Sequence, residues 1–280
     1  MQKTIGVVPH LFARPLVYGL EEAGSKFRLD YASPTTLASK MREGALDLAF
    51  LSPIDYALNS SDYSIIPGIG VSSPTADRSV LLGFHQGLKN IGTVAVADAS
   101  TSEVVLTRII LKEKHEIDPT FVPLPPSSLL SVEAMLDRAD AALITGDDGP
   151  LKGYAFQSAF DLVDEWLDLT GLPFVHGFWV VRPNALSEEG VRDLRTSKER
   201  GINGLEEIAA AAAGATQTPI DRVQDFLKSL TFDLDDEDVD ALRQFLRFAF
   251  YHGMIGDVPE LKFVRDARWD SDLDPNSLLN

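Results

Sequence analysis

The chain has 280 residues and a formal net charge of −17 at pH 7, with 45% hydrophobic and 24% charged residues. This excess of negative charge argues strongly against binding to nucleic acid or to an anionic membrane through general electrostatics. The absence of cysteine excludes disulfides, thiolate nucleophiles and cysteine metal sites. The length exceeds that of a usual single core and predicts two lobes or one large α/β domain.

Short apolar strands alternate with capped helices in the first part of the chain. We expect strands at residues 3–8, 27–31, 46–51, 64–69 and 79–84. Helices are expected after the loop at residues 8–15 and after the capping residues Ser33 and Ser52, each of which precedes a proline. The strand at 46–51 is almost entirely apolar, as is typical of a strand covered on both faces.

A strand-to-helix switch at residues 92–107 is a candidate binding site. An alternating strand at 93–97 is followed by the string STSE at 100–103, which has the S-x-x-E pattern of a capping box. A helix that begins directly after a strand presents unpaired N–H groups and the positive end of its dipole above the sheet. We therefore expect an anion to bind there.

The second part of the chain continues the alternation and ends in helices. Strands are expected at 121–124, 141–144 and 174–181, and helices at 127–138, around Trp166 and from Ser187 onward. This order predicts an α/β fold with mostly parallel sheets flanked by helices, in which ligands lie beyond the carboxyl ends of the strands. We expect one lobe from residues 1–89 and 174–280, including the C-terminal helices, and an inserted second lobe from residues 90–173.

The N-terminal residues do not have the pattern of an export signal. They contain one lysine and an apolar run of only four residues before Pro9, and no stretch of about 18 apolar residues follows anywhere in the chain. We expect a cytoplasmic protein that is a monomer or a homodimer.

Eight short strings occur along the chain in an order that characterises one family. They are Ala13-Arg14-Pro15-Leu16, GALDLA at 44–49, Arg78-Ser79-Val80, Gly146-Asp147, Asp161-Leu162 with Glu165-Trp166, TGLPF at 170–174, Trp179 with Arg182, and VPELKF at 258–263. Over about residues 5–263 the chain resembles the chorismate dehydratase family of menaquinone biosynthesis, in the futalosine pathway. Members of that family have a two-lobed type II periplasmic-binding-protein-like fold.

The resemblance implies a lyase that removes water from chorismate to give 3-[(1-carboxyvinyl)oxy]benzoate. A ring proton and the neighbouring hydroxyl leave, and aromatisation drives the reaction. No metal or organic cofactor is implied. The implied ligand is a small anionic aromatic or cyclohexadienyl carboxylate, held between two lobes that close over it and exclude water.

The chain departs from the family pattern at three places. Family members usually carry Asn where this chain has Phe12, whose ring we expect to turn into the core. The family string Ser-Arg-Thr-Ser corresponds to residues 100–103, and the Gly-Pro before Ser-Val is lost, so that Arg78 adjoins Ser79. One alternative is therefore a binding protein or an altered-substrate relative for a small aromatic or dicarboxylic acid. Another is the later enzyme of the same pathway, although Ala-Arg-Pro-Leu fits the dehydratase better.

Two residues are candidates for catalysis. His10 lies in the first loop of the expected cleft and titrates near neutrality in its unperturbed state, so it is a candidate base. Ser79 lies at a strand end, where its hydroxyl could contact a carboxylate or bond its own turn. The remaining candidates, all for substrate binding, are Phe12, Arg14, Ser52, Arg78, Ser100, Thr101, Ser102, Glu103 and Asp147.

Most of these binding candidates also have a structural interpretation. Ser52 and the serines of the central switch could be ordinary helix caps, and Glu103 is expected to be the partner in the capping box. Arg14 and Arg78 could grip a carboxylate with two hydrogen bonds or lie in surface ion pairs. For Asp147 we favour capping of the next helix over contact with a ligand hydroxyl.

Metal binding is not predicted. The five histidines, His10, His85, His115, His176 and His252, have no metal-ligand spacing, and we expect His176 to be buried with its hydrogen bonds satisfied. The acidic run at 233–240 lacks the glycine of a calcium loop and leads into a helical pattern.

Overall fold

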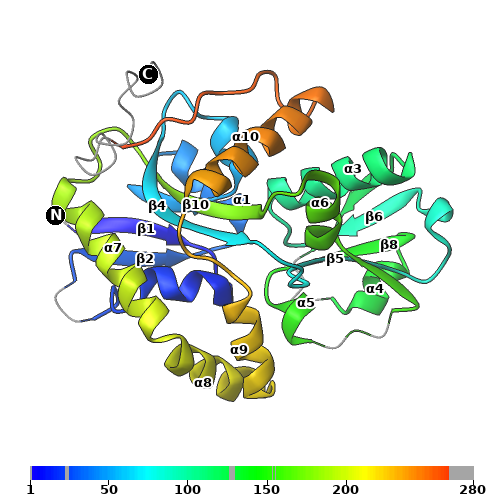
Figure 1. Cartoon of the computed structure of the whole chain (residues 1–280), viewed down its shortest axis with the longest axis horizontal. Helices are drawn as coiled ribbons and strands as arrows, with labels where there is room; N and C mark the ends of the chain where they lie inside the picture. The colour runs from blue at the N-terminus through cyan, green and yellow to red at the C-terminus, as the bar shows by residue number, and fades with distance from the viewer. Residues whose placement is uncertain (1, 23–24, 126–129, 153, 155, 265–280) are drawn as a thin grey trace, which may run out of the picture.

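Two five-stranded mixed sheets, each flanked by helices, make up the computed structural model (Figure 1). It describes residues 2–22, 25–125, 130–152, 154 and 156–264. The predicted α/β class and the two-lobed arrangement are confirmed. Within the described residues, no helix combines the length and the apolar character that a membrane span requires.

The first sheet has the strand order β2-β1-β3-β10-β4. Its strands are β1 (Lys3–Val7), β2 (Phe27–Tyr31), β3 (Leu48–Leu51), β4 (Ser64–Ser73) and β10 (Phe174–Val181). β1 pairs in parallel with β2 and β3, whereas β10 pairs antiparallel with both β3 and β4. All strands of this sheet except β10 therefore run in one direction.

The second sheet repeats this plan with the order β7-β6-β8-β5-β9. Its strands are β5 (Val80–Phe84), β6 (Thr93–Val96), β7 (Thr120–Pro123), β8 (Ala141–Thr145) and β9 (Ser158–Asp161). β6 pairs in parallel with β7 and β8, and β5 runs against β8 and β9. Because β5 belongs to this sheet, the chain enters the second lobe before β5. The boundary expected between residues 89 and 90 had placed this strand in the first lobe.

Helices pack on both lobes and differ from the expectations mainly in length. They are η1 (Leu11–Val17), α1 (Pro34–Arg42), α2 (Pro53–Ala57), η2 (Leu88–Asn90), α3 (Thr101–His115), α4 (Val132–Leu136), α5 (Asp148–Leu151), α6 (Leu162–Thr170), α7 (Glu188–Asn203), α8 (Leu205–Thr216), α9 (Ile220–Lys228) and α10 (Asp236–Tyr251). The first of these is a 3₁₀ helix that contains Pro15, which has no N–H to donate. The helix expected at 127–138 begins outside the described residues. Within the described part of that range, the helix is α4.

Local capping explains where the first helices begin. The side chains of Ser33, Ser52 and Ser100 each accept the N–H of the residue three positions later, at the starts of α1, α2 and α3. Pro34 and Pro53 occupy the first helical position, where no N–H is needed. These starts were predictable because a cap involves only neighbouring residues.

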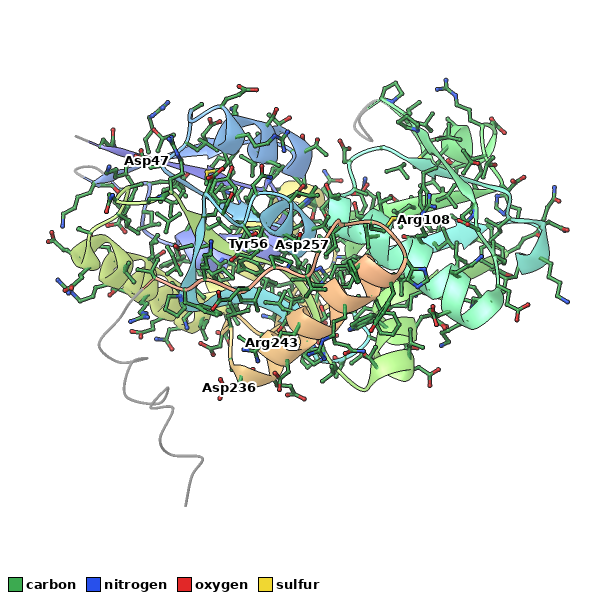
Figure 2. The ribbon with its side chains drawn as sticks, turned by 90° about the horizontal axis from the view of Figure 1, so that it is seen from above. Asp47, Tyr56, Arg108, Asp236, Arg243 and Asp257 are labelled. Atoms are coloured by element: carbon green, nitrogen blue, oxygen red, sulfur yellow. The ribbon has the colours of Figure 1, made fainter. Side chains whose placement is uncertain are left out.

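The C-terminal helix α10 ties the two lobes together. Its residues Phe245, Leu246 and Ala249 are buried in the core of the second lobe, together with Phe174 at the start of β10. Its residues Val239, Ala241 and Leu242 are buried in the core of the first lobe, and the labels Asp236 and Arg243 mark the helix in Figure 2. Because this one helix is buried in both cores, it holds the two lobes together.

Candidate functional site

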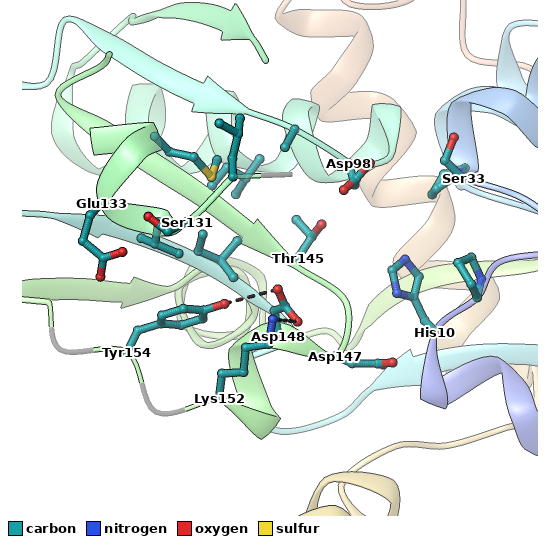
Figure 3. Close-up of a pocket in the computed structure, with 18 residues that line it drawn as sticks. His10, Ser33, Asp98, Ser131, Glu133, Thr145, Asp147, Asp148, Lys152 and Tyr154 are labelled. Carbon is teal, nitrogen blue, oxygen red and sulfur yellow. Dashed lines mark hydrogen bonds and ion pairs between the residues drawn. The ribbon is translucent and has the colours of Figure 1, made fainter. Parts of the chain in front are cut away.

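A pocket of about 530 Å³ lies where strands of both sheets end. On the first lobe it is lined by Pro9 and His10, which follow β1, and by Ser33, which follows β2. On the second lobe it is lined by Asp98, which follows β6, and by Asp147, which follows β8. This interlobe pocket (Figure 3) therefore occupies the position where ligands bind in parallel α/β sheets.

The His10 imidazole forms part of the pocket wall on the first lobe. Burial is the main cause that lowers its pKa from 6.5 to about 4, against the opposing charges of Asp98 and Asp148. No described residue makes a hydrogen bond with its ring, which packs against Phe12 with centroids 5.2 Å apart. His10 is therefore a neutral imidazole at pH 7, able to accept a proton from a bound molecule.

The lining of the pocket is acidic. Asp98, Glu133, Asp147 and Asp148 contribute carboxylates, and Lys152 contributes an ammonium group that lies 2.8 Å from Asp148 in an ion pair. The hydroxyl of Tyr154 donates to the same Asp148 at 3.2 Å, as Figure 3 shows. A dianionic ligand in this pocket thus meets more negative than positive charge.

Asp147 connects the two lobes. Its two carboxylate oxygens accept the backbone N–H of Leu11 at 2.7 and 2.8 Å. Burial raises its pKa to about 7, although the bond from Leu11 opposes that shift. Asp147 stands at the N-cap position of α5, but its side chain makes no hydrogen bond there. The expectation that it caps the following helix is wrong, because its carboxylate is directed at the other lobe.

Gly146 brings the chain close to His10, and a methyl group there should disturb the pocket. A Cβ on Gly146, at φ +69°, would lie 2.4 Å from Nδ1 of His10, whereas Gly171 has the same φ with nothing within 4 Å. Both alanine variants lose about 1–2 kcal/mol of stability from left-handed backbone strain. We expect Gly146→Ala to lose more in urea denaturation, because the imidazole must move, and equal losses would contradict the contact.

Phe12 is buried in the core of the first lobe, as predicted from the sequence. Its ring is 4% exposed and stacks on the His176 ring with centroids 5.6 Å apart. It also contacts the His10 ring, with centroids 5.2 Å apart, so it lies next to both histidines. Phe12 does not line the interlobe pocket.

Ser79 belongs to a buried polar cluster behind Phe12. Its hydroxyl donates to Asp77 at 2.6 Å, and Ser73 donates to the other oxygen of Asp77. His176 Nε2 lies 2.7 Å from the Ser73 hydroxyl, so this nitrogen carries the proton and donates it to Ser73. Nδ1 of His176 is buried without a hydrogen-bond partner among the described residues, so the histidine is buried as expected but only half satisfied.

The start of α3 is satisfied by the chain's own side chains. Glu103 accepts the N–H of Ser100 and completes the predicted capping box, and burial raises its pKa to about 7. The Thr101 hydroxyl donates to Asp55 at 2.7 Å, and the Ser102 hydroxyl accepts the N–H of Ile54. These contacts join α3 to α2, so the structure supports the capping interpretation of this segment.

Three further candidates lie apart from the interlobe pocket. Ser52 donates to Asp55 at 2.7 Å within α2. Arg78 is exposed at φ +64°, and its backbone N–H donates to Asp161. Arg14 is exposed beside Tyr31 and lines a neighbouring pocket. The arginines predicted to hold a carboxylate are therefore not in the wall that carries His10.

Sequence reasoning missed most of the second-lobe wall. Asp98 could have been found, because it directly follows a strand and so lies at the edge where ligands bind. Tyr154 follows α5 in an irregular segment and has no comparable sequence signal. Its place at the pocket depends on the fold of the whole lobe.

The family profile for menaquinone biosynthesis matches residues 3–251. The chain belongs to the menaquinone-biosynthesis family. A curated relative, the chorismate dehydratase of Thermus thermophilus, is 26% identical to this member over 260 residues, which cover 86% of this chain and 93% of the relative. The family resemblance inferred from the eight short strings is thereby confirmed.

Solved structures show that this menaquinone-biosynthesis family member has a periplasmic-binding-protein-like fold. Protein AF1704 from Archaeoglobus fulgidus superposes with a TM-score of 0.72 at 20% identity, covering 91% of this chain and 98% of the other. The alkanesulfonate-binding protein SsuA from Xanthomonas axonopodis pv. citri superposes with a TM-score of 0.62 at 14% identity, covering 94% and 96%. At these identities the likeness concerns the fold alone.

Proposed function

We propose that the protein dehydrates chorismate to 3-[(1-carboxyvinyl)oxy]benzoate in the interlobe pocket. The observation that carries this proposal is the match to the menaquinone-biosynthesis family over residues 3–251, together with the chorismate dehydratase relative that covers 86% of this chain. A volume of about 530 Å³ lies within the usual range for small-molecule sites. The ligand is thus a small ring acid enclosed between the two lobes.

His10 supplies the base in this proposal. The neutral imidazole takes the proton from the ring carbon that carries the carboxyvinyl ether, and the electron pair of that C–H bond forms a ring double bond. The C–O bond of the neighbouring hydroxyl breaks, and the imidazolium returns its proton to the departing hydroxide. The products are the aromatic ether and water, and His10 ends in the state in which it began.

A second candidate function is favoured by the acidic lining of the pocket. Among the described residues that line it, four carboxylate residues face one ammonium group, and the Phe12 ring is buried against the His176 ring. A binding protein or a relative with an altered substrate would retain the pocket without the dehydration. This candidate predicts ligand-dependent stabilisation without turnover.

Chorismate incubation followed by chromatography tests the proposal. The purified protein should form the meta-substituted carboxyvinyloxybenzoate, and a buffer blank should not. The sample is first shown to be folded by circular dichroism, so that inactivity cannot be attributed to unfolding. Unchanged chorismate with folded protein would overturn the proposal and favour the second candidate, for which thermal shifts with aromatic and dicarboxylic acids identify the ligand class.

A further inference from the structure

A second pocket of about 450 Å³ lies beside the interlobe pocket. It is lined by Arg14 of η1, by Tyr18, which follows η1, and by Ile208 and Ala212 of α8. Tyr31, at the end of β2, also lines it. Among the described residues, this Arg14 pocket therefore combines an apolar helix face with the guanidinium group of Arg14 and the carboxylate of Glu21.

The Arg14 side chain is held in place but retains free donors. Its guanidinium carbon lies 5.0 Å from the centre of the Tyr31 ring, and one of its nitrogens lies 3.2 Å from the Tyr31 hydroxyl. Among the described residues, no carboxylate forms an ion pair with it. An arginine stacked on an aromatic ring, with its planar fork of donors unused, is suited to bind a carboxylate with two hydrogen bonds.

Asp147 forms the partition between the two pockets. Asp147 and Pro9 line both of them, and the contact from Asp147 to the N–H of Leu11 crosses from the second lobe to the first. The negative charge of Asp147 lies close enough to Arg14 for the two groups to affect each other. While this contact is made, a carboxylate approaching Arg14 from the interlobe pocket meets a like charge.

We propose that Arg14 binds a carboxylate of the ring acid once Asp147 has released Leu11, which joins the two pockets into one site. His10 stands at the start of η1 and Arg14 lies within it, separated by about 8 Å of 3₁₀ rise. That separation suits an acid whose carboxylate is held by Arg14 while its ring lies beside His10. The inference rests on the proposed function for the ligand class, but carboxylate binding is measurable without turnover.

The pH dependence of binding follows from the surroundings of Asp147. The charged and titratable groups near it are His10, Arg14, Glu21, Tyr31, Asp98, Asp148 and Lys152. Arg222 of α9 also donates a hydrogen bond to the carbonyl of Leu151 in α5. Burial raises the Asp147 pKa to about 7, so its repulsion of an anion is lost as the pH falls through this value. An anionic probe should bind about tenfold more tightly at about pH 6 than at about pH 8.

Isothermal titration calorimetry with 3-hydroxybenzoate tests the inference, with 3-hydroxybenzamide as the uncharged comparison. Arg14→Gln should weaken 3-hydroxybenzoate about tenfold to a hundredfold and leave the benzamide unchanged. Asp147→Asn lacks the charge, and its neutral amide accepts the Leu11 N–H more weakly than a carboxylate does, so it should tighten 3-hydroxybenzoate and remove the pH dependence. Arg243→Gln, on the exposed side of α10, is the matched control and should bind as the wild type does.

Each outcome decides the inference. If 3-hydroxybenzoate does not bind the wild type, or binds Arg14→Gln equally well, the inference is wrong. Tighter binding at higher pH, or weaker binding to Asp147→Asn, would also overturn it. Binding that depends on Arg14 in a protein that leaves chorismate unchanged supports the inference and contradicts the proposed function. Turnover of chorismate that does not depend on Arg14 supports the proposed function and contradicts the inference.

Discussion

Replacing His10 with Gln is expected to lower the rate of chorismate dehydration about a hundredfold to ten-thousandfold, because positioned general bases contribute rates of this order. The amide of Gln is not basic at neutral pH, although it has a similar reach. Initial rates from chromatography at saturating chorismate measure the effect on kcat. Since His10 would act on the reacting C–H bond, the loss should appear in kcat more than in KM.

The pH profile identifies the group responsible. Burial lowers the His10 pKa to about 4, so the basic form is present at neutral pH and is lost as the pH falls through about 4. The wild-type rate should therefore remain level from neutral pH down to about pH 5 and then fall. A midpoint near the unperturbed value of about 6.5 would contradict the lowered pKa of His10.

His252→Gln is the matched control for this experiment. His252 contacts Glu113 at 2.8 Å and does not line the interlobe pocket. The variant should retain the wild-type rate and pH profile. If His10→Gln also retained the rate, the proton would have to be taken by another group, and the proposed role of His10 would be contradicted.

Replacing Glu103 with Gln is expected to stabilise the protein at about pH 8 by about 1–3 kcal/mol, because each unit of pKa shift corresponds to about 1.4 kcal/mol. The Glu103 side chain is 8% exposed, and burial raises its pKa from 4.5 to about 7. At pH 8 the folded protein therefore bears the cost of a buried charge. A Gln side chain retains an oxygen that can accept the N–H of Ser100 and so keeps the capping box.

The sign of the pH dependence follows from the raised pKa. A carboxyl group that binds its proton more tightly in the folded state makes the protein less stable as the pH rises from about 4.5 to about 7. Asp147, Asp161 and Asp238 also have raised pKa values, to about 7, 6 and 6. His10 has a lowered pKa and opposes this trend below about 6.5. We expect the free energy of unfolding to rise as the pH is lowered from about 8 to about 5.

Urea denaturation of the wild type and Glu103→Gln at several pH values measures both effects. The two proteins should differ at about pH 8 and converge toward about pH 5, where Glu103 becomes protonated in the folded state. Glu237→Gln, an exposed glutamate in the first turn of α10, should not stabilise the protein. A Glu103→Gln variant that is less stable than the wild type at pH 8 would show that the charge is compensated.

The sequence predicted the elements and their caps well because these depend on neighbouring residues. The capping box joins Ser100 to Glu103, three positions later, and forms as the S-x-x-E pattern predicts. The same local reasoning was wrong for Asp147, where the N-cap position suggested capping. Its carboxylate bonds Leu11, which is 136 positions away in the chain, and no local pattern identifies such a partner.

The position of the candidate site was predictable, but its composition was not. His10 and Asp98 follow strands, and strand ends of parallel sheets meet at one edge, so sequence order alone places them near the pocket. Arg14 and Arg78 were predicted to serve the same ligand, yet they lie in different surroundings. Side-chain direction on η1 sends Arg14 to Tyr31, and the backbone turn at Arg78 leaves that residue exposed.

By itself, the sequence determined the α/β class, the family and the start of each early helix, because hydrophobic period, short strings and caps are all encoded within a few residues. Only the tertiary structure decided that β5 joins the second sheet, that Phe12 contacts both His10 and His176, and that Asp147 bonds the other lobe between the two pockets. These features depend on contacts between distant segments, which form only when whole sheets and helices pack. The physical reason is that hydrogen-bond partners and burial are properties of the packed chain, whereas propensity is a property of the residue and its neighbours.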